Sequence, residues 1–355
     1  MMKKVLLISN EVMHYRVSIY NYFYQEFKKI GWEFIVRSDR LQKNNPYQLS
    51  FDFKEIKFSF AEYKQEILQI NPDVVIIFLH LKEFIIWPLI HWLKLKKIPI
   101  VFWTKGMNLD KPDDKMSVAL YKYVHAVVDR MILYSEHEKK FIKSKYYSKI
   151  TIANNTINYK DFPDIQQSKE EIRNEFNIPY KKIVLSVGRM GVAGGRKKID
   201  HLIQIFDNFD NPDIGLVIVG SGVNKESVGK ENKNITYLGE VYDDKNIKIS
   251  KIFKMSDIFC IPGHVGLGLN QAMFWGLPVI TEEGKQPPEI YHLKDNFNGF
   301  IVPEDDIKQL EIKIRYLLDN DDILIKFSEN AKKSIMKEAS IENMYAGFKK
   351  SIESF

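Results

Sequence analysis

"GHVGLGLNQAMFWGLPVI", residues 263–280, places three closely spaced glycines before a run of helical character that leads into an apolar strand. The glycines are Gly263, Gly266 and Gly268. A glycine-rich loop that opens a helix directs free backbone N–H groups and the positive end of the helix dipole toward one point. This stretch therefore predicts an α/β protein in which the loop is either a tight structural turn or a cradle for a phosphate.

Apolar runs alternate with amphipathic patterns along the rest of the chain. The predicted strands are residues 4–9, 32–38, 73–80, 98–104, 130–135, 149–155, 181–190, 214–222, 234–240, 258–263, 277–281 and 299–303. The predicted helices are residues 16–30, 61–72, 114–129, 199–209, 247–257, 305–320 and 321–339. The strand at 73–80 is apolar on both faces, as a parallel sheet requires. Such alternation indicates parallel sheets with ligands at the carboxyl ends of the strands.

A polar stretch at residues 158–176 interrupts the alternation, which then restarts. With 355 residues, the chain suits two domains of common size. We expect two doubly wound Rossmann-like domains facing a cleft. The first spans residues 1–160 and the second residues 161–339, and a helix at about 340–355 packs back on the first.

Cysteine content and apolar runs constrain the compartment. Cys260 is the only cysteine, so no internal disulfide can form and a reducing compartment is favoured. The N-terminal apolar run stops at Ser9, too early for a signal peptide. The longest apolar stretch, residues 84–93, is about half the length that spans a bilayer. We therefore expect a cytoplasmic protein.

The formal net charge of +6 is unevenly divided. Residues 1–150 hold 25 Lys+Arg and 16 Asp+Glu, a balance of +9, and the remaining 27 basic and 30 acidic residues balance at −3. A basic first half favours an anionic partner, with nucleic acid and an anionic membrane surface as candidates. Lysine-rich helices that simply face solvent explain the same numbers.

Two loops of the second half have the chemistry of an anion site. Gly188 turns the chain after a strand, Arg189 follows, and Lys197 directly precedes a helix. Cations that flank a helix N-terminus suit a diphosphate. The second loop is the opening stretch, in which Asn270 and Gln271 add polar groups to the first turns of the helix. Two such loops in one domain favour a diphosphate over two unrelated turns.

Several motifs occur together in this half: Gly188-Arg189, residues 197–203, residues 272–280, Pro288-Glu289 and residues 299–302. In this order, residues 181–318 resemble the donor-binding domain of the family 4 glycosyltransferases, retaining enzymes of the GT-B fold. The hinge motif of that family is loosely similar to residues 155–158. The first domain would then bind the acceptor and the second the nucleotide-sugar donor.

The resemblance implies roles for particular residues. Arg189 and Lys197 would be the catalytic cations. The residues implied in donor binding are Gly188, Gly239, Gly263, His264, Gly266, Leu267, Gly268, Asn270, Gln271 and Glu289.

The chain departs from the family at its paired glutamates, which fall on Gly263 and Gln271 when the motifs are aligned without gaps. It therefore resembles a subgroup that lacks the pair. In the family, the first glutamate contacts the donor sugar and the second usually contacts the ribose. Gln271 can still hydrogen-bond ribose hydroxyls, whereas Gly263 offers only backbone. Glu282, Glu283 or Glu289 is then a candidate for the sugar contact.

The first half offers four polar residues near predicted strand ends: His14, Arg16, His80 and Lys105. In a parallel sheet they would share one edge and could bind an acceptor or the donor phosphates. Solvated loop side chains are an equally good interpretation, and His80 could instead be a buried histidine with satisfied hydrogen bonds.

The favoured function is retaining transfer of a sugar from a nucleotide diphosphate sugar, with uridine before guanosine as the base, to a bacterial-type surface glycan such as lipopolysaccharide, capsule or a lipid-linked oligosaccharide. The leaving diphosphate, stabilised by Arg189, Lys197 and the amides of 263–268, would accept the acceptor's proton. We expect no cofactor and no metal, because the motifs indicate no metal cluster and the Asp243-Asp244 pair has the character of a turn. Peripheral association with the inner face of the cell membrane through residues 84–97 competes with an ordinary packed helix.

Two other functions stay open. A nicotinamide-dependent oxidoreductase also has two doubly wound domains, but its glycine fingerprint is missing after the first strand. A nucleic-acid-binding protein would use the basic first half and bind in a salt-sensitive manner. We expect no nucleic acid partner.

Overall fold

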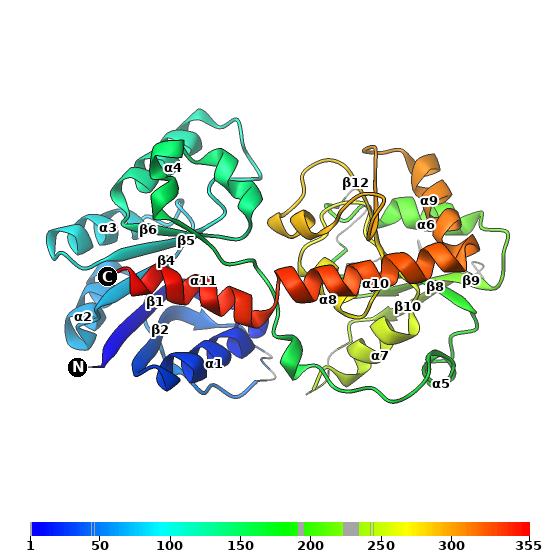
Figure 1. The fold of residues 1–355 in the computed structure, drawn as a ribbon, viewed down its shortest axis with the longest axis horizontal. Helices are drawn as coiled ribbons and strands as arrows, with labels where there is room; N and C mark the ends of the chain where they lie inside the picture. The colour runs from blue at the N-terminus through cyan, green and yellow to red at the C-terminus, as the bar shows by residue number, and fades with distance from the viewer. Residues whose placement is uncertain are drawn as a thin grey trace. The chain divides into compact units, whose positions relative to one another are not determined.

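The structure is a computed structural model that describes residues 2–43, 45, 47–190, 195–222, 234–241, 243 and 245–355. The chain divides into two units, one of Met1–Asn158 with Ser340–Phe355 and one of Tyr159–Ala339. The boundary lies two residues before the one expected from the sequence. The two parallel α/β sheets inferred from the alternating pattern are confirmed (Figure 1).

The sheet of the first unit has seven parallel strands in the described part of the chain, in the order β3-β2-β1-β4-β5-β6-β7. The strands are β1 (Lys3–Val12), β2 (Trp32–Leu41), β3 (Asp52–Glu55), β4 (Val74–Phe78), β5 (Ile100–Thr104), β6 (Arg130–Leu133) and β7 (Ile150–Ile152). The edge strand β3 was not expected, because four residues of "DFKE" carry almost no apolar signal. It pairs with β2 from Ile35 to Ser38.

Helices cover both faces of this sheet. They are α1 (His14–Lys29), α2 (Phe60–Ile70), α3 (Ile86–Leu95), α4 (Lys115–Val127) and α11 (Ile341–Glu353), with the 3₁₀ turns η1 (Glu136–Phe141) and η2 (Ser144–Lys149). Consecutive residues of β1 enter different cores: Leu6 packs with α2, α3 and α4, and Leu7 packs with α1 and α11. This double burial explains why the central strands read as continuous apolar runs.

The last helix, α11, belongs to the core of the first unit. Met344 and Phe348 are fully buried there. The ring of Phe348 lies 4.8 Å from Phe23 of α1 and 4.9 Å from Trp103 of β5, measured between centroids. Aromatic contacts of this kind contribute beyond the area they bury, so α11 is an integral layer of this unit.

The sheet of the second unit has six parallel strands among the described residues, in the order β10-β9-β8-β11-β12-β13. The strands are β8 (Lys182–Val187), β9 (Ile214–Val219), β10 (Ile235–Gly239), β11 (Ile258–Cys260), β12 (Val279–Glu282) and β13 (Gly299–Val302). The helices are α5 (Lys169–Glu175), α6 (Ile199–Asp207), α7 (Ile247–Met255), α8 (Leu267–Phe274), α9 (Ile307–Asp319) and α10 (Asp321–Glu338), with the turns η3 (Tyr159–Asp161) and η4 (Pro288–His292).

The core of this unit on the face of α6 and α9 is made of aliphatic and phenylalanine side chains. Leu202 of α6 and Leu310 of α9 are fully buried against the sheet. On β11, Phe259 stacks on Phe253 of α7 at 5.9 Å. The sheet is thus covered on both faces, which positions the loops after its strands.

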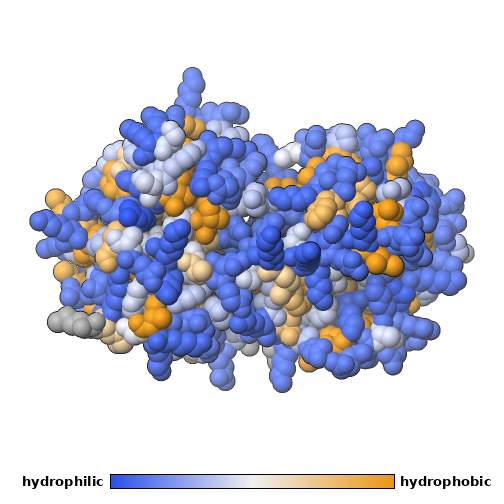
Figure 2. Space-filling model, viewed as in Figure 1, coloured by the Kyte–Doolittle hydropathy of each residue, from blue (hydrophilic) through white to orange (hydrophobic). Residues whose placement is uncertain are grey.

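The surface shown in Figure 2 is largely hydrophilic, with apolar residues in small separate groups. Of the helices that the structure describes, none combines the length and the apolar character needed to cross a bilayer. The apolar stretch at 84–97 instead contains α3, whose residues Ile86, Leu89, Ile90 and Leu93 enter the core.

Candidate active site

The loops after β8 and β11 meet at the point where the strand order reverses. From β8 the chain crosses to β9 and β10 on one side, whereas β11 lies on the other side of β8. In open parallel sheets, ligands bind beside the carboxyl ends of the strands at such a reversal. Gly188 follows β8, and Gly263 lies three residues after Cys260, the last residue of β11. Both loops predicted from the sequence therefore lie at the carboxyl edge of the sheet, where the strand order reverses.

Lys197 connects the two loops. Its Nζ donates to the carbonyl oxygens of His264 and, at 3.0 Å, Val265. A Cβ placed on Gly188 would lie 3.8 Å from this Nζ, and one on Gly266 would lie 3.9 Å from it. Burial lowers the pKa of Lys197 to about 8. The ammonium is thus held between the two glycine loops before any ligand arrives.

The backbone of the loop after β11 corrects one expectation. The N–H groups of Gly263 and His264 donate to the carbonyls of Lys197 at 3.0 Å and Arg196 at 2.7 Å. The N–H of Val265 donates to Oε1 of Gln286 at 3.1 Å. These three amides are therefore occupied inside the protein and do not face a phosphate.

The next three amides differ. The N–H groups of Gly266, Leu267 and Gly268 find no acceptor among the residues that the structure describes. They lie at the N-terminus of α8, where the helix dipole favours an anion. Gly266 has φ +67° and ψ −161°, a conformation that essentially only glycine adopts. The candidate phosphate cradle is therefore 266–268.

Two other glycines are required by close packing. A Cβ on Gly263 would lie 2.0 Å from the carbonyl oxygen of Arg196. A Cβ on Gly268 would lie 3.2 Å from Cζ of Phe259, because α8 packs closely over β11. Gly263 thus permits the pairing between the two loops, and a glutamate side chain at that position would collide with the backbone of residue 196.

The remaining donor-side candidates lie at different depths. Arg189 is exposed and forms no hydrogen bond or ion pair within the described ranges. Gln271 is half-buried on α8, whereas Asn270 is fully buried. Glu289 is buried on η4, where its charge acts to raise the pKa of Lys197. The other candidates, each half-buried, are Gly188, Gly239, His264, Gly266, Leu267 and Gly268.

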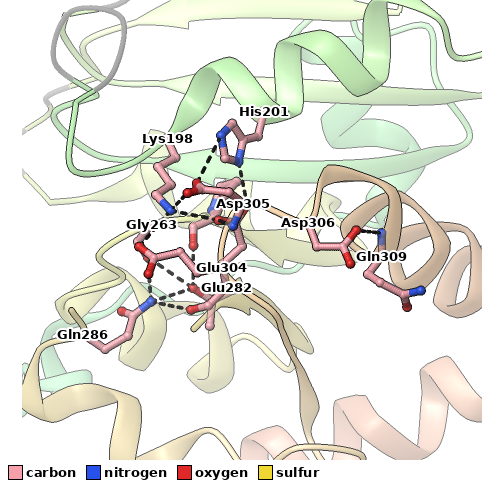
Figure 3. A network of polar contacts seen from close by, with 11 residues as sticks. Lys198, His201, Gly263, Glu282, Gln286, Glu304, Asp305, Asp306 and Gln309 are labelled. Carbon is pink, nitrogen blue, oxygen red and sulfur yellow. Dashed lines mark hydrogen bonds and ion pairs between the residues drawn. The ribbon is translucent and has the colours of Figure 1, made fainter. Parts of the chain in front are cut away.

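Glu282 is bound to other residues of the protein and is a poor candidate for the donor-sugar contact. Its carboxylate is fully buried and accepts from His201 Nδ1 at 2.6 Å, Lys198 Nζ at 3.1 Å and the N–H of Asp305 at 3.0 Å (Figure 3). Glu283, by contrast, is exposed. Glu289, buried near Lys197, and the exposed Glu283 remain candidates for this contact.

His201, Glu282 and Asp305 also form a group whose ligand atoms lie within 4.8 Å of one another. The ammonium of Lys198 donates to both carboxylates of this group, so a cation would have to displace it. The group fits an internal ammonium better than a metal ion. Asp243, by itself, caps α7 through the N–H of Ile247, and Asp244 lies outside the described residues.

The candidates in the first unit follow the carboxyl ends of β1, β4 and β5, and they differ in burial. Arg16 is 2% exposed, lies in the first turn of α1 and places its guanidinium 4.4 Å from the ring of Trp103, with a hydrogen bond to Asn155. His14 hydrogen-bonds Gln42 through its N–H at 3.0 Å and Nδ1 at 2.9 Å. His80 and Lys105 are exposed. Arg16 thus follows the end of β1, as expected from the sequence, but its side chain is buried.

Sequence reasoning missed Lys198 and Gln286. Nε2 of Gln286 donates to the carbonyls of Gly263 and Glu282, both at 2.9 Å, while its Oε1 accepts from Val265. Nothing in "EEGKQPPE" marks this glutamine as a brace. Lys198 carried a signal, because it stands where the family motif has glycine.

Residues 168–334 match the family model "Glycosyl transferases group 1". Spore coat protein SA of Bacillus subtilis is 29% identical over 170 residues, which are 44% of this chain and 44% of that protein. The poly(ribitol-phosphate) alpha-N-acetylglucosaminyltransferase of Staphylococcus aureus is 26% identical over 196 residues, 54% of this chain and 38% of that protein. The chain thus spans less than half the length of these two relatives.

Among solved structures, Anabaena Alr3699/HepE in complex with UDP matches 99% of this chain and 100% of its own with a TM-score of 0.76 at 12% identity. The same protein in complex with UDP-glucose matches equally well, with a TM-score of 0.76. At this identity the match concerns the fold. Residues 168–334, somewhat less than half of the chain, are thus similar to the group 1 glycosyl transferases, and the chain has the two-sheet GT-B fold.

Proposed function

We propose that this protein transfers a sugar from a nucleotide diphosphate sugar to a glycan acceptor, with retention at the anomeric carbon. The observation that carries the proposal is the position of Lys197, whose ammonium lies beside Gly188 and Gly266 at the N-terminus of α8. A fixed cation and three N–H groups without an acceptor in the described part of the chain match the needs of a diphosphate.

Uridine diphosphate is the nucleotide that we favour. HepE, which has a similar fold, has been solved with UDP and with UDP-glucose, and the match of residues 168–334 to the group 1 glycosyl transferases supports a nucleotide-sugar donor. Gln271, one turn into α8, would hydrogen-bond the ribose, and Glu289 would contact the sugar. Guanosine diphosphate is the alternative that a binding comparison should include.

The reaction needs no nucleophile from the protein. The bond between the anomeric carbon and the diphosphate oxygen breaks, and the acceptor hydroxyl oxygen bonds to the same face of that carbon. The hydroxyl proton passes to the departing diphosphate. Arg189, Lys197 and the amides of 266–268 would stabilise the negative charge that develops on the leaving group, which is commonly the largest catalytic contribution. We expect that no metal ion is needed.

The acceptor that we propose is a bacterial surface glycan: a lipopolysaccharide-type glycan, a capsular glycan or a lipid-linked oligosaccharide. One relative acts, by its name, on poly(ribitol-phosphate). His14, His80 and Lys105 of the first unit remain candidates for the acceptor side.

A membrane-facing surface on the first unit would suit a lipid-linked acceptor. Phe84, Leu95 and Met116 are 89%, 82% and 74% exposed. Phe84 lies in the turn before α3, and Leu95 and Met116 lie on α3 and α4, which are joined by a hydrogen bond of 2.7 Å between His91 and Tyr123. The exposed lysines nearby in sequence are Lys82, Lys96, Lys97, Lys115 and Lys122. Aromatic and aliphatic side chains among lysines suit an anionic lipid surface.

The test of the proposed activity is direct. Calorimetric titration with UDP and GDP measures nucleotide affinity, and NMR of the glycoside product reports the anomeric configuration. We expect UDP to bind more tightly than GDP, and activity to persist in EDTA. Tight binding of NAD with no binding of either nucleotide diphosphate would instead favour an oxidoreductase.

A further inference from the structure

The residue next to Lys197 adopts a backbone conformation that disfavours side chains. Lys198 has φ +50° and ψ +41° and stands at the N-cap of α6, without a capping side-chain hydrogen bond. This left-handed region is open to glycine but costs free energy for a residue with a Cβ. A lysine at this position therefore calls for compensating interactions of its side chain.

The ammonium of Lys198 supplies them. It donates to Glu282 Oε2 at 3.1 Å, Glu304 Oε1 at 3.1 Å and Asp305 Oδ1 at 2.6 Å (Figure 3). Glu282 is the last residue of β12, and Glu304 and Asp305 follow β13, whereas Lys198 belongs to the loop after β8. Burial acts to lower the pKa of Lys198, but the hydrogen bonds that its ammonium donates to Asp305, Glu282 and Glu304 raise this pKa above its ordinary value. The ammonium thus joins the loops at the ends of three strands.

Glu282 gives this contact its strength. Its side chain is fully buried, so its charge needs a partner. The side chains of Glu304 and Asp305 are 53% and 68% exposed, so their ion pairs are screened by water. His201 adds a hydrogen bond to Glu282 at 2.6 Å. The Lys198–Glu282 pair is therefore the main element of the cluster.

Lys197 and Lys198 direct their ammonium groups to different partners from one short turn. Lys197 contacts the carbonyls of His264 and Val265 in the candidate phosphate loop. The turn itself is closed by a hydrogen bond of 2.9 Å from the N–H of Lys198 to the carbonyl of Gly195. Fixing one residue of such a turn restricts its neighbour.

We propose that Lys198 is a positioning residue, which anchors this turn through Glu282, Glu304 and Asp305 and so holds the Lys197 ammonium at the phosphate loop. The proposal rests on the proposed function, because it assigns Lys197 to a diphosphate. A cation that is already in place loses less conformational freedom when the ligand binds. Glycine would relieve the backbone strain at this position but could not form these ion pairs, whereas Lys198 accepts the strain and anchors the turn.

The decisive variant is Lys198→Gly, because it removes the ammonium while relaxing the left-handed backbone. We expect it to fold and to bind UDP at least ten-fold more weakly than the wild type. Lys198→Arg keeps a cation and should retain most of the affinity. Asn177→Gly is the matched control, because Asn177 has φ +54° and lies at the end of α5, away from the cluster. It should bind UDP as the wild type does.

A pH series separates positioning from general stability. The groups whose charges act on Lys197 are Glu289 and Arg196, and neither is changed in Lys198→Gly. If the turn loosens, Lys197 reaches water and its pKa rises toward the ordinary value. The UDP affinity of the variant, although weaker, should then begin to fall only at a higher pH than that of the wild type. A purely structural role of Lys198 leaves this limit in place.

The outcomes are distinct. A folded Lys198→Gly protein with wild-type affinity and pH profile overturns the positioning role and leaves the proposed function standing. A wild-type protein that binds neither UDP nor GDP overturns both. Should Lys198→Gly fail to fold, the double variant Glu304→Gln/Asp305→Asn removes only the two exposed partners. It should weaken UDP binding in the same direction by a smaller factor, and unchanged binding there overturns the proposal.

Discussion

The ammonium of Lys197 lies 3.0 Å from the carbonyl oxygen of Val265, inside the loop that precedes α8. Carbonyl oxygens favour the charged amine, whereas burial opposes it and lowers the pKa of Lys197 to about 8. Below that pH the side chain is a cation available to a diphosphate. Above it, the cation is progressively lost.

UDP affinity should therefore fall as the pH rises through about 8, by up to about ten-fold per pH unit. Calorimetric titrations from pH 6 to pH 10 measure this decline. Lys197→Gln, which has no titrating amine, should bind weakly and show no such decline. A wild-type affinity that stays constant across the series would remove Lys197 from the diphosphate site.

Arg189→Ala should impair transfer far more than folding. The side chain is exposed and without partners in the described part of the chain, so its loss should leave the melting temperature nearly unchanged. One charge-assisted contact to the leaving diphosphate contributes about 2–3 kcal/mol, so kcat/KM should drop roughly 30- to 150-fold. Lys197→Ala should lose a comparable factor. Wild-type turnover in both variants would contradict the diphosphate assignment.

The cradle itself is best tested through its amides. Titration with UDP, followed by ¹H–¹⁵N NMR, should shift the signals of Gly266, Leu267 and Gly268 most strongly. The amides of Gly263 and His264, already bonded to residues 196 and 197, serve as internal controls. Gly266→Val is unsuitable, because the backbone angles of Gly266 exclude a side chain whatever the ligand does.

Gln271→Ala tests the ribose contact separately. Loss of one neutral hydrogen bond should weaken UDP binding by about 1 kcal/mol, roughly five-fold. Binding of inorganic pyrophosphate, which has no ribose, should not change. Equal UDP affinities of the variant and the wild type would show that Gln271 faces solvent in the complex.

Gly263→Ala should destabilise the second unit, since the new Cβ would lie 2.0 Å from the carbonyl oxygen of Arg196. Overpacking against backbone costs about 1–3 kcal/mol. Gly31→Ala provides the contrast: Gly31 has φ +74° but nothing within 4 Å of the added Cβ, so only backbone strain of about 1 kcal/mol applies. Urea denaturation measures both. Equal stabilities of Gly263→Ala and the wild type would mean that the two loops are not paired in solution.

Membrane association should depend on the exposed apolar side chains of the first unit. We expect flotation with anionic vesicles but not with neutral ones, weakened by salt. The variant Phe84→Asp/Leu95→Asp should abolish it. Ile325→Asp on α10, where the residue is 57% exposed, is the control and should float like the wild type. Flotation that ignores vesicle charge would argue against an anionic surface.

The features that could be predicted from the sequence are those that depend on local residue patterns. The apolar runs predicted the central strands, and the glycines before α8 marked a loop that lies where the strand order reverses. The Lys198 cluster was not predictable, because its carboxylates at 282, 304 and 305 are more than eighty residues away in the chain. Arg16 was misjudged for a similar reason: its burial depends on Trp103, which reaches it only once the sheet has formed.

The position of α11 affects the order in which the two units can fold during synthesis. Synthesis starts with the first unit, yet the residues that close its core, Met344 and Phe348 among them, emerge after the whole second unit has been made. Tyr159–Ala339 is contiguous and can complete its core first. The unit that begins translation is thus the last to mature, and until then the surface awaiting α11, which includes Phe23 and Trp103, is exposed to chaperones and to aggregation.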